Sequence, residues 1–169
     1  MKVLFTVMMM ACIYCTSAQS FNARQLLDFR TKEFPVINDS CNKLRWKVAH
    51  TRKEEGVNEG AVVWIKESWT GSSAPEEALL MIFSKQRGVR MRYVFQQQDY
   101  YSNLVAQLQD LKFTRSSYDI IDKGFKIVYV GVAGTIEVLY KWDDTARRME
   151  YNFTVWNSSD YMAYLTDGK

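Results

Sequence analysis

The chain has little of the chemistry that most enzyme sites use. Its 169 residues contain one histidine, His50, and three cysteines. Neither G-x-G-x-x-G nor G-x-x-x-x-G-K-[ST] occurs, so these phosphate-binding glycine loops are absent from the sequence. A Ser-His-Asp or Cys-His arrangement would have to use His50, and a transition-metal site needs several converging His, Cys or carboxylate ligands. The sequence therefore disfavours nucleotide-dependent catalysis and predicts no metal and no cofactor.

Proline, glycine and excess charge are also scarce. Two prolines and eight glycines leave little room for long loops, and a net charge of +3 is too small to make nucleic acid an obligate partner. In contrast, 47% of the residues are apolar and 14% are aromatic. This composition excludes a disordered tail, a collagen-like repeat and a low-complexity linker. We therefore expect a folded chain with no nucleic-acid partner.

The first eighteen residues have the pattern of a signal peptide. Lys2 precedes an apolar run, 3–14, and small residues lead to a cleavage site after Ala18. The run is about a dozen residues, shorter than the roughly 20 that span a bilayer. We expect an exported protein, periplasmic or secreted, that is soluble after cleavage and has no transmembrane segment. A form that is lipid-anchored through Cys12 or Cys15 is the alternative.

Cleavage of this leader would change the cysteine count. Only Cys41 would remain, so no intrachain disulfide could form despite an oxidising destination. Cys41 stands at helical spacing from Ile37 and Leu44, which predicts a packed side chain rather than a nucleophile.

Residues 19–97 are expected to form a first half made of helices followed by strands. A short helix carries Leu26 and Phe29, and Pro35 is suited to the first turn of a second helix. From Trp46 the apolar period changes to two, and Trp46 is expected to share one covered strand face with His50. Three more strands are expected at 61–67, 78–85 and 90–96, with a loop at 68–75.

Residues 98–169 are expected to repeat this order. Asp99 can cap a helix whose apolar positions are Tyr101, Leu104, Val105, Leu108 and Leu111. Strands are expected at 114–121, 125–132, 135–142 and 148–156, joined by tight turns.

The two halves can be aligned residue by residue. A shift of 58 aligns 90–95 with 148–153, and Arg, Met, Tyr and Phe recur at matching places. The predicted fold class is α+β: a mostly antiparallel sheet with helices on one face, formed by tandem duplication of a unit of a helix and three or four strands. The two halves form one compact domain. The order of elements is similar to that of tandem exported inhibitors such as the β-lactamase inhibitory proteins, and this likeness alone carries no function.

The polar sides of the two matched hairpins form the candidate binding surface. If the Met, Tyr and Phe positions face the helices, the alternating positions share an open face. These partner-binding candidates are Arg90, Arg92, Arg148, Glu150 and Asn152, with Trp64 and Lys66, and also Tyr140 and Trp142, joining from neighbouring strands. Arg and Trp are frequent binding anchors. The alternative is an ordinary solvated sheet face.

Three functions fit these patterns. The first is an exported, non-enzymatic binding protein whose open sheet face holds a protein partner, as an inhibitor or immunity factor does. The second is a small-molecule or lipid carrier with an apolar cavity. The third is a hydrolase that uses two facing carboxylates. The sequence leaves the partner and the oligomeric state open.

Three N-x-[ST] sequons are present, at Asn38, Asn152 and Asn157. They have meaning only if the source is eukaryotic, and Asn38 lies inside an expected helix.

Overall fold

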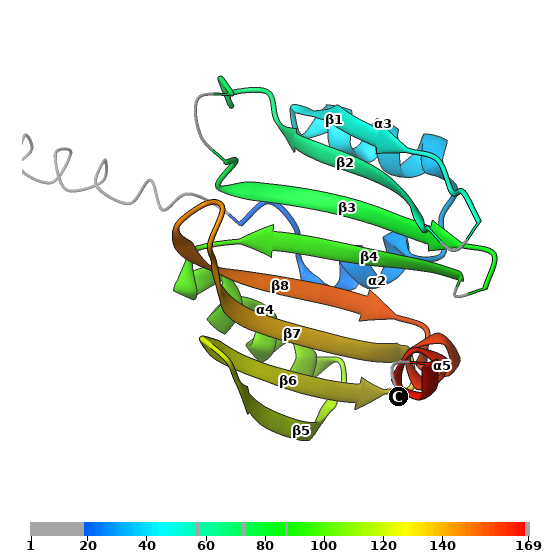
Figure 1. The fold of residues 1–169 in the computed structure, drawn as a ribbon, viewed down its shortest axis with the longest axis vertical. Coiled ribbons are helices and arrows are strands. Elements are labelled where there is room, and N and C mark those ends of the chain that lie inside the picture. The colour runs from blue at the N-terminus through cyan, green and yellow to red at the C-terminus, as the bar shows by residue number, and fades with distance from the viewer. Residues whose placement is uncertain (1–18, 57, 72–73, 87, 168–169) are drawn as a thin grey trace, which may run out of the picture.

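Eight strands form one antiparallel sheet in the order β1-β2-β3-β4-β8-β7-β6-β5 (Figure 1). The computed structural model describes residues 19–167 apart from 57, 72, 73 and 87, so the expected signal peptide lies outside the described residues. The strands are β1 (Trp46–Arg52), β2 (Gly60–Lys66), β3 (Glu77–Ser84), β4 (Gly88–Phe95), β5 (Thr114–Ile121), β6 (Gly124–Gly131), β7 (Gly134–Asp143) and β8 (Arg148–Trp156). The mixed α and β composition and the antiparallel sheet are confirmed.

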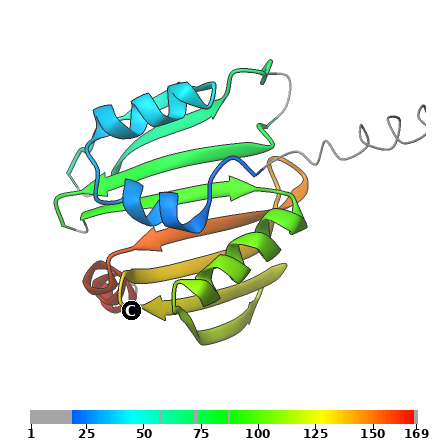
Figure 2. The ribbon, with the colours of Figure 1, turned by 180° about the vertical axis from the view of Figure 1, so that it is seen from behind.

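Four helices accompany the sheet: α2 (Ala23–Phe29), α3 (Phe34–Lys43), α4 (Gln98–Asp110) and α5 (Ser158–Asp167). Figure 2 shows α2, α3 and α4 lying across the same side of the sheet, whereas α5 lies at one end. We call the side that carries α2, α3 and α4 the helix face, and the opposite side the open face.

Alternation along the strands separates the two faces. In β4, Met91, Tyr93 and Phe95 are fully buried in the main hydrophobic core, which fills the helix face. Arg90 and Arg92 stand at the alternate positions and project to the open face. The period of two in this hairpin therefore predicts the orientation of both sets of side chains.

The first two helices begin as their sequence indicates. Asn22 and Gln25 form a capping box at α2, and a proline occupies the first turn of α3. Ile37 and Cys41 are buried against the core, which confirms the packed cysteine. Burial raises the pKa of the Cys41 thiol to about 12, so the thiol is protonated at neutral pH.

The start of α4 differs from the prediction. Its N-cap is Gln97, which makes no side-chain cap bond, and Asp99 lies within the first turn. At this position the Asp99 carboxylate still interacts favourably with the positive end of the helix dipole. The helix begins two residues earlier than a cap at Asp99 would allow, and Tyr100, rather than Tyr101, joins Leu104 and Leu108 among its buried residues.

The predicted position of His50 is wrong. The pairing of β1 with β2 shifts between Val48 and His50, so that Val48 pairs with Trp64 and His50 pairs with Val63. This bulge moves His50 from the covered face to the open face, where it is exposed. A period of two cannot reveal an inserted residue, and the helix-side expectation for His50 fails for that reason.

The C-terminal helix α5 was not expected from the sequence. Its Tyr161 packs with Val128 of β6 and Trp156 of β8 in a small second core. Because those two residues project to the open face, α5 covers one end of that face. Within the described part of the chain, no helix has the length and apolar character needed to cross a membrane.

Candidate partner-binding face

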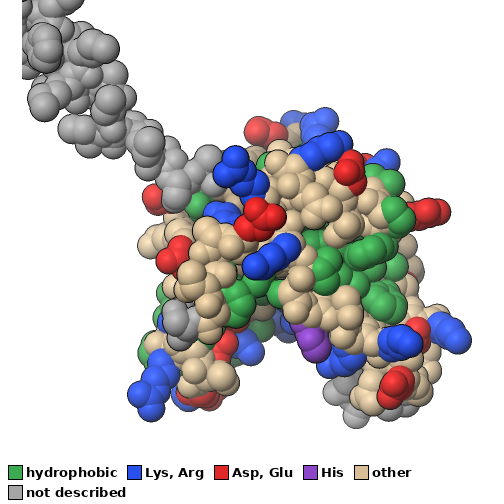
Figure 3. Space-filling view, turned by 90° about the horizontal axis from the view of Figure 1, so that it is seen from above, with side chains coloured by type: hydrophobic (Ala, Val, Ile, Leu, Met, Phe, Trp, Pro, Cys, Tyr) green, Lys and Arg blue, Asp and Glu red, His purple; other side chains and the backbone are tan. Residues whose placement is uncertain are grey.

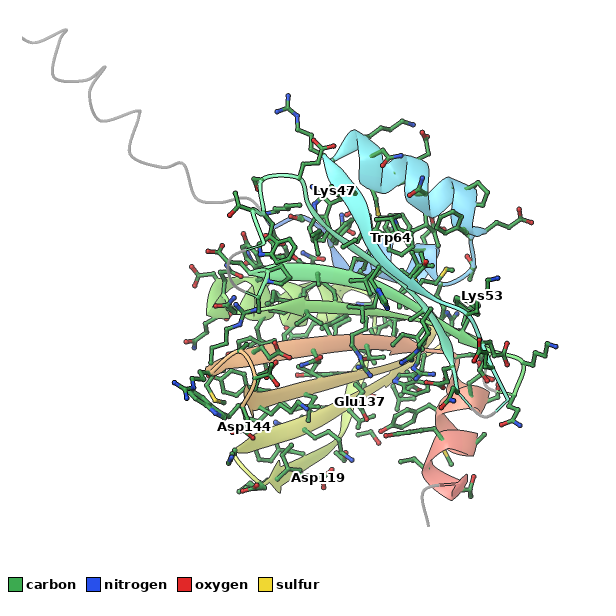
Figure 4. The ribbon with its side chains drawn as sticks, turned by 45° about the horizontal axis from the view of Figure 1, so that its top comes forward. Lys47, Lys53, Trp64, Asp119, Glu137 and Asp144 are labelled. Carbon is green, nitrogen blue, oxygen red and sulfur yellow. The ribbon has the colours of Figure 1, made fainter. Side chains whose placement is uncertain are left out.

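The open face is crossed by one continuous row of paired residues. The row runs His50, Val63, Leu80, Arg92, Thr154 and Glu137, from β1 through β4 and β8 to β7. Figure 3 views the molecule from above and shows that the side facing the viewer in Figure 1 is hollowed between two projecting parts. Figure 4 labels Glu137 on β7, near the middle of the sheet, and Asp119 on the edge strand β5. The row therefore lies along the floor of a concave surface.

Arg90 is a buried charge with its own partner. Its Nη1 donates to Oε1 of Glu59 at 2.7 Å, and its Nη2 donates to the other carboxylate oxygen. The guanidinium carbon also lies 4.5 Å from the ring centroid of Trp156, a cation–π arrangement. The Arg90 side chain is only 7% exposed. These contacts hold the Arg90 side chain within the fold near α5, and little of its surface is accessible to a partner.

Arg92, in contrast, keeps donors available. Its Nε donates to Oγ1 of Thr154 at 3.1 Å, and no described residue is bonded to its Nη1 or Nη2. Burial, and then repulsion by Arg90, lowers the pKa of Arg92, while Glu137 acts in the opposite direction. The Arg92 guanidinium is thus partly desolvated, and its Nη1 and Nη2 are bonded to no described residue on the open face.

Glu137 is the carboxylate nearest to this position in the row. Burial raises its pKa, and the charges of Lys126 and Arg92 and a hydrogen bond with Tyr161 counteract part of that rise. Burial and the charge of Glu137 in turn raise the pKa of Tyr161 to about 12. Tyr161 of α5 therefore lies close to Glu137 of β7.

Glu150 and Asn152 lie together on the open face, as predicted for β8. Asn152 Nδ2 donates to Oε1 of Glu150 at 3.1 Å, and both residues are buried. Arg148 projects from the same side but serves the loop between β2 and β3. Its two terminal nitrogens donate to the carbonyls of Ala74 and Pro75, so it holds that loop against the end of the sheet.

The placement of Trp64 on the open face is wrong. Trp64 is fully buried in the main core, and its Nε1 donates to Oδ1 of Asn38 in α3 at 3.0 Å. Its ring stacks on Phe34 of the same helix. β2 is apolar on both faces, so its alternation carries no information on which side turns toward the helices.

The placements of Lys66 and Tyr140 fail in the same way. Lys66 pairs with Trp46, and its ammonium group forms an ion pair with the buried Glu77. Tyr93 of the core also donates to that carboxylate. Tyr140 stacks with Tyr151 in the helix-face core, and both residues therefore belong to the helix face.

Several residues of the open face were missed by the sequence analysis. Glu137 and Thr154 stand at alternate positions of expected strands, and continuing the period of two would have found them. The same period also includes Trp156. Glu59 and Tyr161 had no such signal, because their roles depend on the β1–β2 loop and on α5.

A groove of about 450 Å³ runs beside α5. Its lining is mainly apolar and includes Val128, Val130, Met162 and Leu165, with Asp119 and Lys126 at its polar side. Met162 and Leu165 are exposed. The groove is continuous with the open face through Lys126, which projects from β6 on the same side as Asn152.

The described residues hold no group of three or more His, Cys, Asp or Glu side chains placed to bind a metal. Comparison with known proteins finds no family model, no curated protein and no solved structure that matches the chain.

Proposed function

We propose that this chain is an exported, non-enzymatic binding protein that holds a protein partner against the open face of its sheet, as an inhibitor or immunity factor does. In this proposal the two halves, 19–97 and 98–169, derive from a duplicated unit of helix and strands. Helices α2, α3 and α4 lie on one face, α5 covers one end of the other face, and the rest of that face is left for the partner. The single observation that carries the proposal is the Arg92 guanidinium, which lies on the open face between Leu80 and Thr154 and whose Nη1 and Nη2 are bonded to no described residue.

The charges around Arg92 favour an acidic group on the partner. Arg90 is paired with Glu59 and Lys126 with Asp119, whereas Nη1 and Nη2 of Arg92 are bonded to no described residue. A partner carboxylate that receives both Arg92 donors would form a bidentate pair in a site already partly desolvated, where such a pair is strong.

Aliphatic side chains surround this guanidinium. Leu80 pairs with Arg92, and Val94 and Leu139 flank Asn152 in the next row. All three are only partly buried. A charged centre with an apolar surround is the arrangement in which a binding anchor is shielded from water. We therefore expect the partner to insert an acidic side chain that has apolar neighbours.

The test compares binding by the wild type, Arg92→Glu and Lys32→Glu. Lys32 follows α2, away from the open face, and its side chain is 44% exposed, so its variant is a matched charge reversal. Partners are captured by cross-linking on intact source cells and quantified by mass spectrometry. We expect Arg92→Glu to lose the partner at least about tenfold, the loss that 1.4 kcal/mol produces, while Lys32→Glu retains it. Unchanged capture by a folded Arg92→Glu protein would refute the proposal.

The groove beside α5 favours a second candidate, a carrier of a small apolar molecule. Its volume of about 450 Å³ is in the range of small-molecule sites, and its lining is mainly apolar. Native mass spectrometry of protein purified from its own source decides between the two. A bound small molecule that is lost in Met162→Asp would support the carrier, and an unliganded chain would count against it.

A further inference from the structure

The three N-x-[ST] sequons differ sharply in what their side chains do in the fold. A sequon pairs an Asn side-chain amide with a hydroxyl two residues later, and a bulky glycan requires that the Asn be at the surface. The contacts of each Asn and each hydroxyl therefore show which of the three can carry a glycan in the folded protein.

The Asn38 side chain is bonded to a residue of the main core. Asn38 lies inside α3, and its Oδ1 accepts the hydrogen bond of the buried Trp64 Nε1. The hydroxyl of Ser40 donates to the carbonyl of Val36 at 2.9 Å, within the same helix. Asn38 is partly buried, and its amide is held against a fully buried tryptophan, so a glycan there would disturb this contact.

Both polar residues of the Asn152 sequon are bonded to side chains of the open face. Asn152 is 7% exposed in the middle of β8, and its Nδ2, the atom that would be glycosylated, donates to Glu150. The hydroxyl of Thr154 is buried and accepts a hydrogen bond from Arg92. Modification here would replace one hydrogen of the Nδ2 that donates to Glu150 and would place a sugar at a residue that the sheet surface buries.

The sequon at Asn157 is different in each of these respects. Asn157 is exposed, and it lies in the connection between the end of β8 and the start of α5. The hydroxyl of Ser159 donates to Asn157 Oδ1 at 3.1 Å, and the backbone N–H of Ser159 donates to the same oxygen at 3.2 Å. The two groups of this sequon are thus already in contact. No described residue accepts a hydrogen bond from Asn157 Nδ2.

We propose that Asn157 is an N-glycosylation site and that it is the sequon occupied in the folded, secreted protein. The donor is a lipid diphosphate-linked oligosaccharide. Nδ2 of Asn157 forms a bond to C1 of the first sugar, and the bond between C1 and the diphosphate oxygen breaks. The lipid diphosphate leaves with the electron pair, and the amide nitrogen loses one proton. No electrons are exchanged with an oxidant or reductant.

This modification rests on the export in the proposed function, and it takes the secretory route of a eukaryotic cell. Figure 1 shows β8 ending beside α5 at one end of the sheet. A glycan attached there would extend from the rim and leave Arg92, in the middle of β4, accessible. The modified protein therefore keeps the proposed partner-binding face.

The test uses the full chain, secreted by its own cells or by a cultured cell line of the same source. Intact mass is measured before and after treatment with a peptide N-glycosidase, and glycopeptides are mapped. We expect the mass of one glycan, lost on treatment, with the former attachment site at Asn157 converted to Asp. Asn38 and Asn152 are expected to be unmodified.

Two matched Ser→Ala variants complete the experiment. Ser159→Ala removes the hydroxyl of the Asn157 sequon and should abolish the mass shift. Ser40→Ala makes the same change in the Asn38 sequon and should leave the shift unaltered. A secreted chain without a glycan, or with its glycan at Asn38 or Asn152, would overturn this inference while leaving export and partner binding intact. A chain retained inside the cell would instead refute the export on which both depend.

Discussion

The helix face and the open face of this sheet are built from the same strands but bury different chemistry. The helix face is filled by aromatic and aliphatic side chains, with Trp46, Trp64 and Phe95 among the largest that are fully buried. The open face carries arginines, carboxylates and amides, several of them also buried. Burial therefore does not distinguish the two faces. The difference lies in the charged groups: Glu77 of the helix face and Arg90 of the open face each have a partner of opposite charge, whereas Nη1 and Nη2 of Arg92 are bonded to no described residue.

The open face is itself divided by α5. Beneath this helix, Arg90 is held by Glu59 and Trp156, and its donors serve the fold. Beyond the helix, Arg92 is partly buried with its fork free. Two arginines only two residues apart thus have different surroundings, and in the proposed function Arg92 is the one that binds the partner. The comparison of the two faces can be tested by removing one group at a time.

The largest effect is expected on the helix face, from Trp64→Ala. The substitution leaves a cavity against Phe34 and removes the hydrogen bond to Asn38. We expect the free energy of unfolding to fall by about 4 kcal/mol, measured by urea denaturation. A loss below about 1 kcal/mol would contradict the placement of this ring in the core.

The next effect is expected on the open face, from Glu59→Ala. This change leaves the Arg90 guanidinium buried without its carboxylate. We expect a loss of about 3 kcal/mol, since removal of one member of a buried pair leaves an uncompensated charge. The double variant Glu59→Leu with Arg90→Met should recover most of this loss. If the double variant were as unstable as the single one, the ion pair would not be the cause.

A smaller loss is expected under α5, from Tyr161→Ala. Tyr161 is buried against Val128 and Trp156 and holds Glu137 by a hydrogen bond. Because α5 packs along one side only, we expect about 2 kcal/mol in urea denaturation. Trp156 should also become accessible to acrylamide quenching of its fluorescence. A loss of stability without any change in quenching would place the effect elsewhere.

The smallest effect is a pH dependence at Glu137. Burial raises its pKa above the ordinary value of 4.5 in the folded protein, so the folded state binds this proton more tightly than the unfolded state. The stability it contributes is fully present below pH 4.5 and is lost as pH rises through the raised pKa. We expect Glu137→Gln to remove this part of the pH dependence between pH 4.5 and neutrality, measured by denaturation at a series of pH values. Parallel stability curves for the two proteins would rule out this assignment.

The strands were predictable because most of them carry a period of two or an apolar run and end at a turn. The hairpin of β3 and β4 and that of β7 and β8 lie where the sequence places them. Arg90, Arg92, Glu150 and Asn152 project to the open face for the same reason. Trp64 was misplaced because β2 is apolar on both sides, and His50 because a bulge precedes it.

The sequence by itself determined the alternation of chemistry along strands such as β4 and β8, the proline in the first turn of α3 and the scarcity of histidine and thiol. These properties are local, since they depend on backbone geometry and on residue type. Only the tertiary structure decided that β4 pairs with β8, that α5 lies over one end of the open face, and that Glu59 is joined to Arg90. Such contacts join residues far apart in the chain, and their energies depend on burial, which no short sequence pattern records.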